Sequence, residues 1–236
     1  MTHYVLVHGA WEGSWTWDLT APVLEGKGHQ VTTVDLPGSH SNEAEVSEVS
    51  MARYIQTVTS EVSRFDHEVV LVGHSLAGAV ISQVAELLPE KVEKLIYVTA
   101  FLLQNGDSPL EAMQRDPGSD FLSNITFSED QSYASASEET VRSFAFHDVG
   151  EDRIQHSLPL MAAQQATEPF VSKVSVSQER FGKVRKLYIR TTEDKMISFG
   201  FQNEMIKGWA VEEVRDLASG HFPTLSVPEK LAELLL

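Results

Sequence analysis

The chain has 236 residues, a formal net charge of −16, 42% hydrophobic residues and no cysteine. This composition is that of a globular domain, and the lack of clustered Lys and Arg excludes nucleic acid and anionic membrane surfaces as partners. The absence of cysteine excludes disulfides, thiolate metal sites and cysteine nucleophiles. No apolar stretch reaches the roughly 18 residues of a membrane helix, and no signal-like segment precedes the first apolar run, so we expect a cytoplasmic protein.

Short apolar runs alternate with amphipathic segments, which is typical of a parallel sheet covered by helices on both faces. The expected strands span residues 4–7, 30–35, 69–72, 94–99, 186–191 and 211–217. The expected helices span residues 17–27, 50–65, 77–88, 199–207 and 228–236. This alternation predicts an α/β fold with about six mainly parallel strands flanked by helices.

The alternation breaks after the fourth expected strand. Residues 104–181 contain Pro and Gly breakers, the polar tract 132–139 and only two helix-like pieces, at 138–146 and 153–164. This stretch is short for a second core but has the length of a lid. We therefore predict a helical cap at 104–181, inserted over the carboxyl edge of a core formed by residues 1–103 and 182–236.

The segment 69–78, VVLVGHSLAG, indicates a strand, a sharp turn and a helix, with Ser75 at the turn. Such a turn exposes the serine hydroxyl above the sheet, and small residues are needed two positions either side of it, here Gly73 and Ala77. The usual pattern ends in Gly, so Ala77 is a departure, although Gly78 follows. Taken alone, the segment also fits a serine that merely caps a helix.

A serine nucleophile needs a base to accept its proton and a carboxylate to orient that base. In this arrangement the acid and then the histidine follow the serine, on loops after late strands. Of the nine histidines, only His221 follows the last expected strand; the others lie at strand starts, in early loops, in the cap or beside Ser75. The loop after residue 191 offers both Glu193 and Asp194 as the acid.

The negative charge that develops on an attacked carbonyl needs backbone N–H donors. The N–H of Leu76, directly after the serine, is one candidate. The loop after the first strand supplies the second, since Gly9 allows a close turn and brings the Ala10 N–H toward the pocket. The alternative is a glycine-rich turn that only connects a strand to a helix.

These motifs resemble a known family. The HGAW sequence at 8–11, GHSLAG at 73–78, ERFG at 179–182 and TEDK at 192–195 are similar to α/β-hydrolases that include plant methylesterases, hydroxynitrile lyases and related bacterial esterases. The resemblance covers nearly the whole chain and is weakest from 104 to 176. It implies Ser75 as nucleophile, Asp194 rather than Glu193 as acid, and His221 as base, with Ala10 and Leu76 as oxyanion-hole donors.

The resemblance also bears on the reaction. Lyases of this family typically carry Thr at the position of Gly9 and Lys at the position of Phe222, and neither is present. We therefore expect a carboxylesterase-type serine hydrolase that cleaves a small ester through an acyl-Ser75 intermediate. The alternatives are a hydroxynitrile-lyase-like or other C–C bond enzyme on the same scaffold, and a catalytically weak small-molecule binding protein.

Aromatic residues near these motifs suggest an apolar substrate pocket. The expected lining is Gly9, Trp11, Trp15, Phe101 and Phe222, although the same aromatic residues would equally serve to pack the loops against the core. No cofactor and no metal are expected, and the expected partner is a small-molecule ester. Because relatives in this family are often dimers, the resemblance makes a homodimer one option for the assembly.

Overall fold

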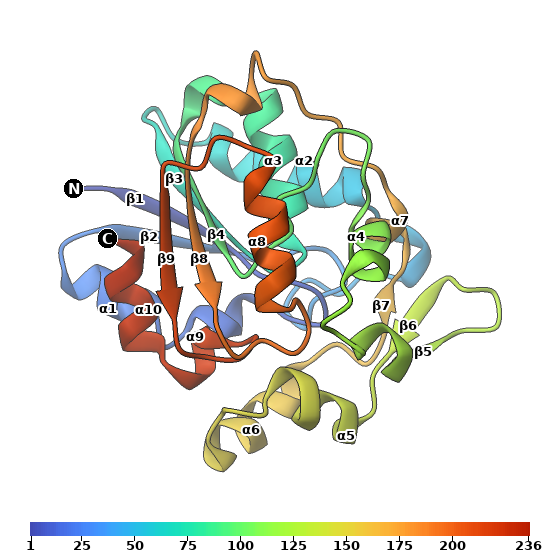
Figure 1. Ribbon diagram of the computed structural model, residues 1–236. Helices are drawn as coiled ribbons and strands as arrows, with labels where there is room; N and C mark the ends of the chain where they lie inside the picture. Colours follow the sequence, from blue (N-terminus) through green and yellow to red (C-terminus); the bar gives the residue numbers. More distant parts are fainter.

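A computed structural model describes all 236 residues of the chain (Figure 1). Six parallel strands form the main sheet in the order β2-β1-β3-β4-β8-β9. They are β1 (His3–Val7), β2 (Gln30–Val34), β3 (Val69–His74), β4 (Val92–Val98), β8 (Arg185–Thr191) and β9 (Glu213–Leu217). The prediction of an α/β fold with about six strands is confirmed.

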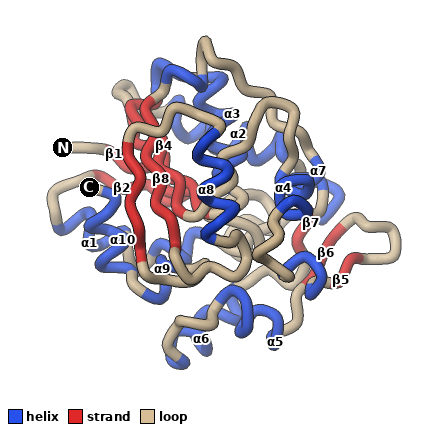
Figure 2. Tube along the Cα trace, viewed as in Figure 1, coloured by secondary structure: helices blue, strands red, loops and turns tan.

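Helices cover both faces of this sheet (Figure 2). One face packs against α1 (Ala21–Gly26) and α10 (Pro228–Leu235). The other packs against α2 (Met51–Ser63), α3 (Ala77–Leu87) and α8 (Phe199–Lys207). The central strands are apolar without interruption because alternate side chains enter the two cores: Val69 and Leu71 of β3 face α2 and α3, whereas Val70 and Val72 face α1 and α10.

Local signals set the helix boundaries. Ser50 caps α2 by accepting a 3.2 Å hydrogen bond from the Arg53 N–H. After α3 ends at Leu87, Pro89 opens a short 3₁₀ turn that leads into β4. The single helix expected at 17–27 is instead a 3₁₀ turn at Ser14–Trp17 followed by the separate α1.

The cap segment, residues 99–184 between β4 and β8, is only partly helical. It contains α4 (Pro109–Arg115), α5 (Glu138–Thr140), α6 (Glu151–Ser157) and α7 (Glu168–Val171), and α5 continues as a π-helical turn at Val141–Ala145. It also contains a three-stranded antiparallel sheet of β5 (Thr126–Phe127), β6 (Tyr133–Ser135) and β7 (Gln165–Ala166). The sequence did not indicate this sheet, because strands of two or three residues are too short to show a period-two pattern.

In Figure 1, α5 and α6 lie on the side to which the arrowheads of β8 and β9 point, beyond the carboxyl ends of the strands. A last short helix, α9 (Pro223–Ser226), connects the loop after β9 to α10. None of the helices is both long and apolar enough to span a bilayer. The division into core and cap at residues 104 and 181 stays a prediction.

Candidate active site

Ser75 lies in the tight turn between β3 and α3. Its φ angle is +52°, a left-handed conformation that is uncommon for any residue other than glycine. The Ser75 N–H donates to the Val98 carbonyl at 3.3 Å, and the Ser75 carbonyl accepts from the N–H groups of Gly78 at 3.1 Å and Phe101 at 3.0 Å. Bonds to β4 and to the chain that follows it therefore hold the turn in its strained conformation.

Small residues on either side permit this turn. A Cβ atom at Gly73 would lie 3.0 Å from the Ala77 backbone, and one at Gly78 would lie 2.6 Å from the Phe101 carbonyl oxygen. Gly78 thus allows α3 to lie close to the backbone of Phe101. Ala77 is itself fully buried at the start of the helix, so its methyl group fits where the usual pattern has glycine.

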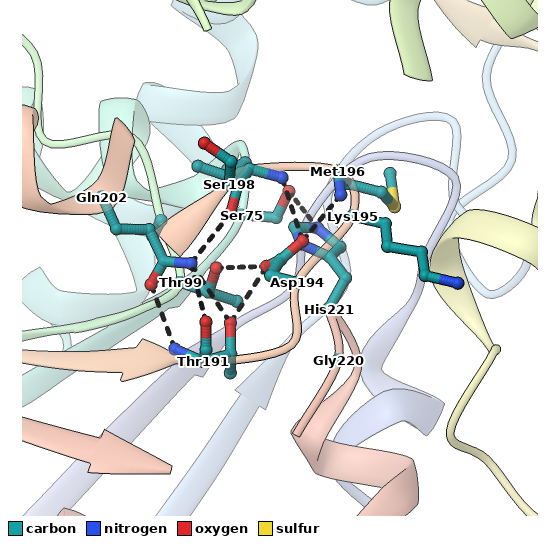
Figure 3. A network of polar contacts seen from close by, with 12 residues as sticks. Ser75, Thr99, Thr191, Asp194, Lys195, Met196, Ser198, Gln202, Gly220 and His221 are labelled. Atoms are coloured by element: carbon teal, nitrogen blue, oxygen red, sulfur yellow. Dashed lines mark hydrogen bonds and ion pairs between the residues drawn. The ribbon is translucent and has the colours of Figure 1, made fainter. Parts of the chain in front are cut away.

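His221 and Asp194 complete a hydrogen-bonded chain with Ser75 (Figure 3). His221 Nε2 lies 2.9 Å from Ser75 Oγ, and His221 Nδ1 lies 2.8 Å from Asp194 Oδ2. Because a carboxylate only accepts hydrogen bonds, Nδ1 carries the proton and Nε2 is free to accept one from the serine hydroxyl. All three side chains are buried, whereas Glu193, the other candidate acid, is exposed.

The Asp194 carboxylate is held by donors on both oxygens. Oδ1 accepts from the N–H groups of Met196 at 2.7 Å and Ile197 at 2.9 Å, and Oδ2 accepts from the hydroxyls of Thr191 and Thr99 as well as from His221. Burial alone raises the pKa of Asp194. The opposing effect of His221 and the hydrogen bonds is stronger and holds this pKa below its ordinary value. Asp194 is therefore ionised over the neutral range and fixes the His221 ring.

Ala10 and Leu76 present backbone donors beside this chain. Neither N–H donates to an acceptor within the protein, and Ala10 lines the cavity that contains Ser75. Leu76 directly follows the serine and precedes the first residue of α3. Both N–H groups are thus without an acceptor inside the protein, and their role as oxyanion donors stays a prediction.

A second polar pair lies behind the serine. His74 Nδ1 is 2.8 Å from Glu12 Oε1, and His74 Nε2 is 2.7 Å from the backbone carbonyl of His221. Both side chains are buried. Burial lowers the pKa of His74 and raises that of Glu12, but their mutual attraction and hydrogen bonds outweigh burial, so the pKa of His74 is raised and that of Glu12 lowered. Both shifts favour the imidazolium and carboxylate form of the pair.

Two neighbouring residues of the cap segment contact the loops that carry Asp194 and His221, one loop each. His147 Nε2 lies 3.0 Å from the Glu193 carbonyl, so it donates to the loop that carries Asp194. Asp148 Oδ2 accepts from the Gly220 N–H at 2.7 Å and from the Ser219 hydroxyl at 3.2 Å, in the loop that carries His221. The cap segment thus supports the backbone of both candidate residues.

A mainly apolar cavity of about 350 Å³ opens onto Ser75 and His221. Three of the five residues expected near the substrate line it, namely Trp11, Phe101 and Phe222, together with Ala10, which was expected as an oxyanion donor. Gly9 lies directly behind Ser75, since a Cβ atom there would be 2.8 Å from Ser75 Cβ. Trp15 is not among the lining residues: it lies in the 3₁₀ turn at Ser14–Trp17 and packs against the apolar cluster that includes Phe146, Phe222 and Leu225.

Other residues of the site were not indicated by the sequence. Glu12 lines the cavity, as do five apolar residues of the cap segment and of the loop after β8: Met113, Phe121, Phe170, Met196 and Ile197. The position of Glu12 two residues after Ala10 was the only available signal for it. No group of three or more His, Asp or Glu side chains is arranged to hold a metal ion.

The chain is similar in sequence to named plant proteins. The chain is 30% identical over 245 residues to putative methylesterase 11, chloroplastic, of Arabidopsis thaliana, covering 99% of this chain but 63% of that relative's length. It is 29% identical over 247 residues to the alpha-hydroxynitrile lyase of Arabidopsis thaliana, covering 99% of this chain and 95% of that protein. The chain thus spans less than two thirds of some of the relatives it matches.

The fold is also that of solved hydrolases. The crystal structure of a pyrethroid hydrolase from Sphingobium faniae JZ-2 matches with a TM-score of 0.86 and 28% identity, over 99% of this chain and 95% of that one. The model of the alpha/beta hydrolase family matches residues 4–234, which is nearly the entire chain. The chain therefore belongs to the alpha/beta hydrolase family.

Proposed function

We propose that this protein is a carboxylesterase-type serine hydrolase that cleaves an uncharged ester through an acyl-Ser75 intermediate. The single observation that carries the proposal is the continuous hydrogen-bonded chain from Ser75 through His221 to Asp194, buried at the floor of an apolar cavity. The relatives named as methylesterase and pyrethroid hydrolase support ester hydrolysis as the reaction.

The geometry supports a two-step reaction. In the first step, Ser75 Oγ attacks the ester carbonyl while His221 Nε2 takes the hydroxyl proton, and the Ala10 and Leu76 N–H groups stabilise the oxyanion. The C–O bond to the alcohol then breaks, and His221 returns the proton to the leaving alkoxide. In the second step, water gives a proton to His221 and attacks the acyl carbon, which releases the acid and restores the Ser75 hydroxyl.

Two positions favour hydrolysis over a lyase reaction. A Cβ atom at residue 9 would lie 2.5 Å from Glu12 Oε1 and 2.8 Å from Ser75 Cβ, so the threonine typical of lyases does not fit this backbone. Phe222 is 2% exposed and packs edge-to-face on Phe146, so a lysine there would lack both solvent and a partner.

Hydrolysis of p-nitrophenyl butyrate by the wild-type chain and by Ser75→Ala tests the proposal. We expect turnover by the wild type and a loss of at least 10³-fold in the variant, because the oxyanion donors alone retain only residual catalysis. Hydrolysis that persists in Ser75→Ala would contradict the assignment of the nucleophile. Cleavage of cyanohydrins without ester hydrolysis would instead support the lyase alternative.

A further inference from the structure

A second apolar cavity lies next to the one that contains Ser75. It encloses about 480 Å³, including space open to solvent at its mouth, and nine of its eleven lining residues are hydrophobic. None of the eleven carries a charge. The two cavities share Trp11, Met113 and Phe170 as lining residues, so these three side chains form the partition between them.

The partition has one fixed and one adaptable member. Trp11 has a φ of +60°, its N–H donates to Gln165 Oε1 at 2.9 Å, and its carbonyl accepts from the Ala162 N–H at 3.0 Å. These constraints fix the backbone that carries the indole. Met113 lies on α4 and is an unbranched side chain with three rotatable bonds, which lets it make room without a backbone change.

The outer cavity also reaches the surface. Phe127, with 40% of its area exposed, and Val171, with 51% exposed, line it and are among the few large apolar side chains exposed on the chain. Contiguous apolar surface of this kind that leads into a cavity is typical of a ligand-binding site. In a chain with a net charge of −16, an uncharged lining favours a neutral apolar ligand over an anionic one.

We infer that the outer cavity is a substrate subsite that binds one apolar arm of the ester, long enough to pass Trp11 and Met113 from the cavity at Ser75. The inference rests on the proposed function, because the occupant is part of the molecule that Ser75 attacks. It deepens that function by naming the substrate class: neutral esters with an extended hydrocarbon or aryl arm, rather than short esters alone.

Two ester series measure the use of this subsite by the complete chain. One is p-nitrophenyl butyrate, octanoate and dodecanoate, in which the acyl arm grows; the other is methyl, hexyl and decyl butyrate, in which the alcohol arm grows. Burying an additional methylene contributes up to about fourfold in affinity. We therefore expect kcat/KM to rise at least tenfold along one series in the wild type.

Substitutions that touch only the outer cavity test where the arm lies. Leu122 lines the outer cavity and not the inner one, and Leu122→Trp fills part of that space. It is expected to lower kcat/KM for the longest ester of the favoured series at least tenfold more than for p-nitrophenyl butyrate.

Val171→Asp places a charge at the exposed mouth of the outer cavity without burying it. It is expected to lower kcat/KM for the longest ester at least threefold more than for p-nitrophenyl butyrate. The matched control is Leu19→Trp, on an exposed residue outside both cavities, which is expected to leave the ratio of the two kcat/KM values unchanged.

The outcomes separate the two proposals. If the wild type hydrolyses p-nitrophenyl butyrate but gains nothing along either series, the subsite is overturned and the esterase proposal stands. The subsite is equally overturned if both variants lower the rates for short and long esters by the same factor. If no ester is hydrolysed by the folded wild type, the proposed function fails and the subsite inference fails with it.

Discussion

The imidazole of His74 donates a 2.7 Å hydrogen bond to the backbone carbonyl of His221, although the two residues are 147 positions apart in the chain. The residue that precedes the nucleophile thus holds the backbone of the candidate base. The other ring nitrogen of His74 is hydrogen-bonded to Glu12, which lies on the loop after β1, two residues beyond Ala10. The pair therefore ties together three segments that must keep a common geometry for catalysis.

This arrangement predicts a pH-dependent defect in Glu12→Gln. The amide removes the negative charge that raises the pKa of His74, so His74 loses a proton at lower pH than in the wild type. The neutral ring keeps a single N–H in place of two, which weakens the link between residue 12 and the His221 carbonyl. We expect kcat of the variant to fall roughly tenfold relative to the wild type at pH 8. The ratio of variant to wild-type kcat should recover as the pH falls and His74 is protonated again. A ratio that is constant with pH would assign the pair a purely structural role.

The same pair predicts a window of maximal stability. The raised pKa of His74 contributes stability that is complete below its ordinary value of 6.5 and is lost as the pH rises through the raised pKa. The lowered pKa of Glu12 contributes stability that is complete above its ordinary value of 4.5 and is lost as the pH falls through the lowered pKa. The difference in unfolding free energy between wild type and Glu12→Gln should therefore be largest between pH 4.5 and 6.5.

Urea unfolding at several pH values measures this difference. Removing one partner of a buried ion pair typically costs about 3–5 kcal/mol. We expect a smaller cost for Glu12→Gln, about 2 kcal/mol, because the amide oxygen still accepts from Nδ1. A difference that is unchanged from pH 4 to 9 would show that folding does not shift the pKa values of Glu12 and His74.

Asp194→Asn should reduce activity without unfolding the chain. The amide preserves the shape but cannot hold the proton of His221 on Nδ1, so Nε2 no longer accepts from Ser75; such a change lowers kcat by roughly 10⁴ in a triad. The matched control is Glu193→Gln, at the exposed neighbouring carboxylate, which is expected to change kcat by less than twofold. Equal losses in the two variants would contradict the choice of Asp194.

Asp148→Ala should lower kcat while leaving KM nearly unchanged. The substitution removes the acceptor for the Gly220 N–H and Ser219 hydroxyl, so the loop before His221 loses its anchor in the cap segment. A displaced base typically costs roughly tenfold to a hundredfold. Asp148→Asn keeps an acceptor oxygen and is expected to recover most of the rate. If kcat of Asp148→Asn is as low as that of Asp148→Ala, the loss of the anchoring hydrogen bonds does not explain the defect.

Gly9→Ala should impair the site through crowding alone. The added methyl group would lie within 3 Å of both Ser75 Cβ and Glu12 Oε1, so the oxyanion loop must move away from the nucleophile. We expect at least a tenfold loss in kcat/KM for p-nitrophenyl butyrate, with a fall in melting temperature of a few degrees. Gly26→Ala, at an open helix position with no atom near the added methyl, is the control expected to behave as wild type.

The sheet and the nucleophile turn were predictable because their signals are local. The core strands are runs of aliphatic residues buried on both faces, and the turn at Ser75 is marked by small residues on either side within six positions. The order of Ser75, Asp194 and His221 along the chain agrees with their meeting at one edge of the sheet. The strands and the turn are thus visible in short windows of sequence, whereas the choice of Asp194 over Glu193 depended on the family resemblance.

Features that depend on distant contacts were not predictable. The pairing of Glu12 with His74 spans 62 positions, and each residue alone resembles an ordinary polar residue beside a turn. Trp15 was expected near the pocket as one of several aromatic residues close to the motifs, but it lies in the 3₁₀ turn at Ser14–Trp17 and packs against the cluster that contains Phe146 and Leu225. The antiparallel sheet of the cap segment has strands too short to give a periodic signal.

The most direct measurement of the central claim is the intact mass of the chain after reaction with a fluorophosphonate, followed by peptide mapping. An activated serine in a site with oxyanion donors reacts once with this reagent. The account predicts a single adduct on the peptide that contains Ser75 and no adduct on Ser75→Ala under the same conditions. An unlabelled wild-type chain, or an adduct of equal yield on Ser75→Ala, would contradict it.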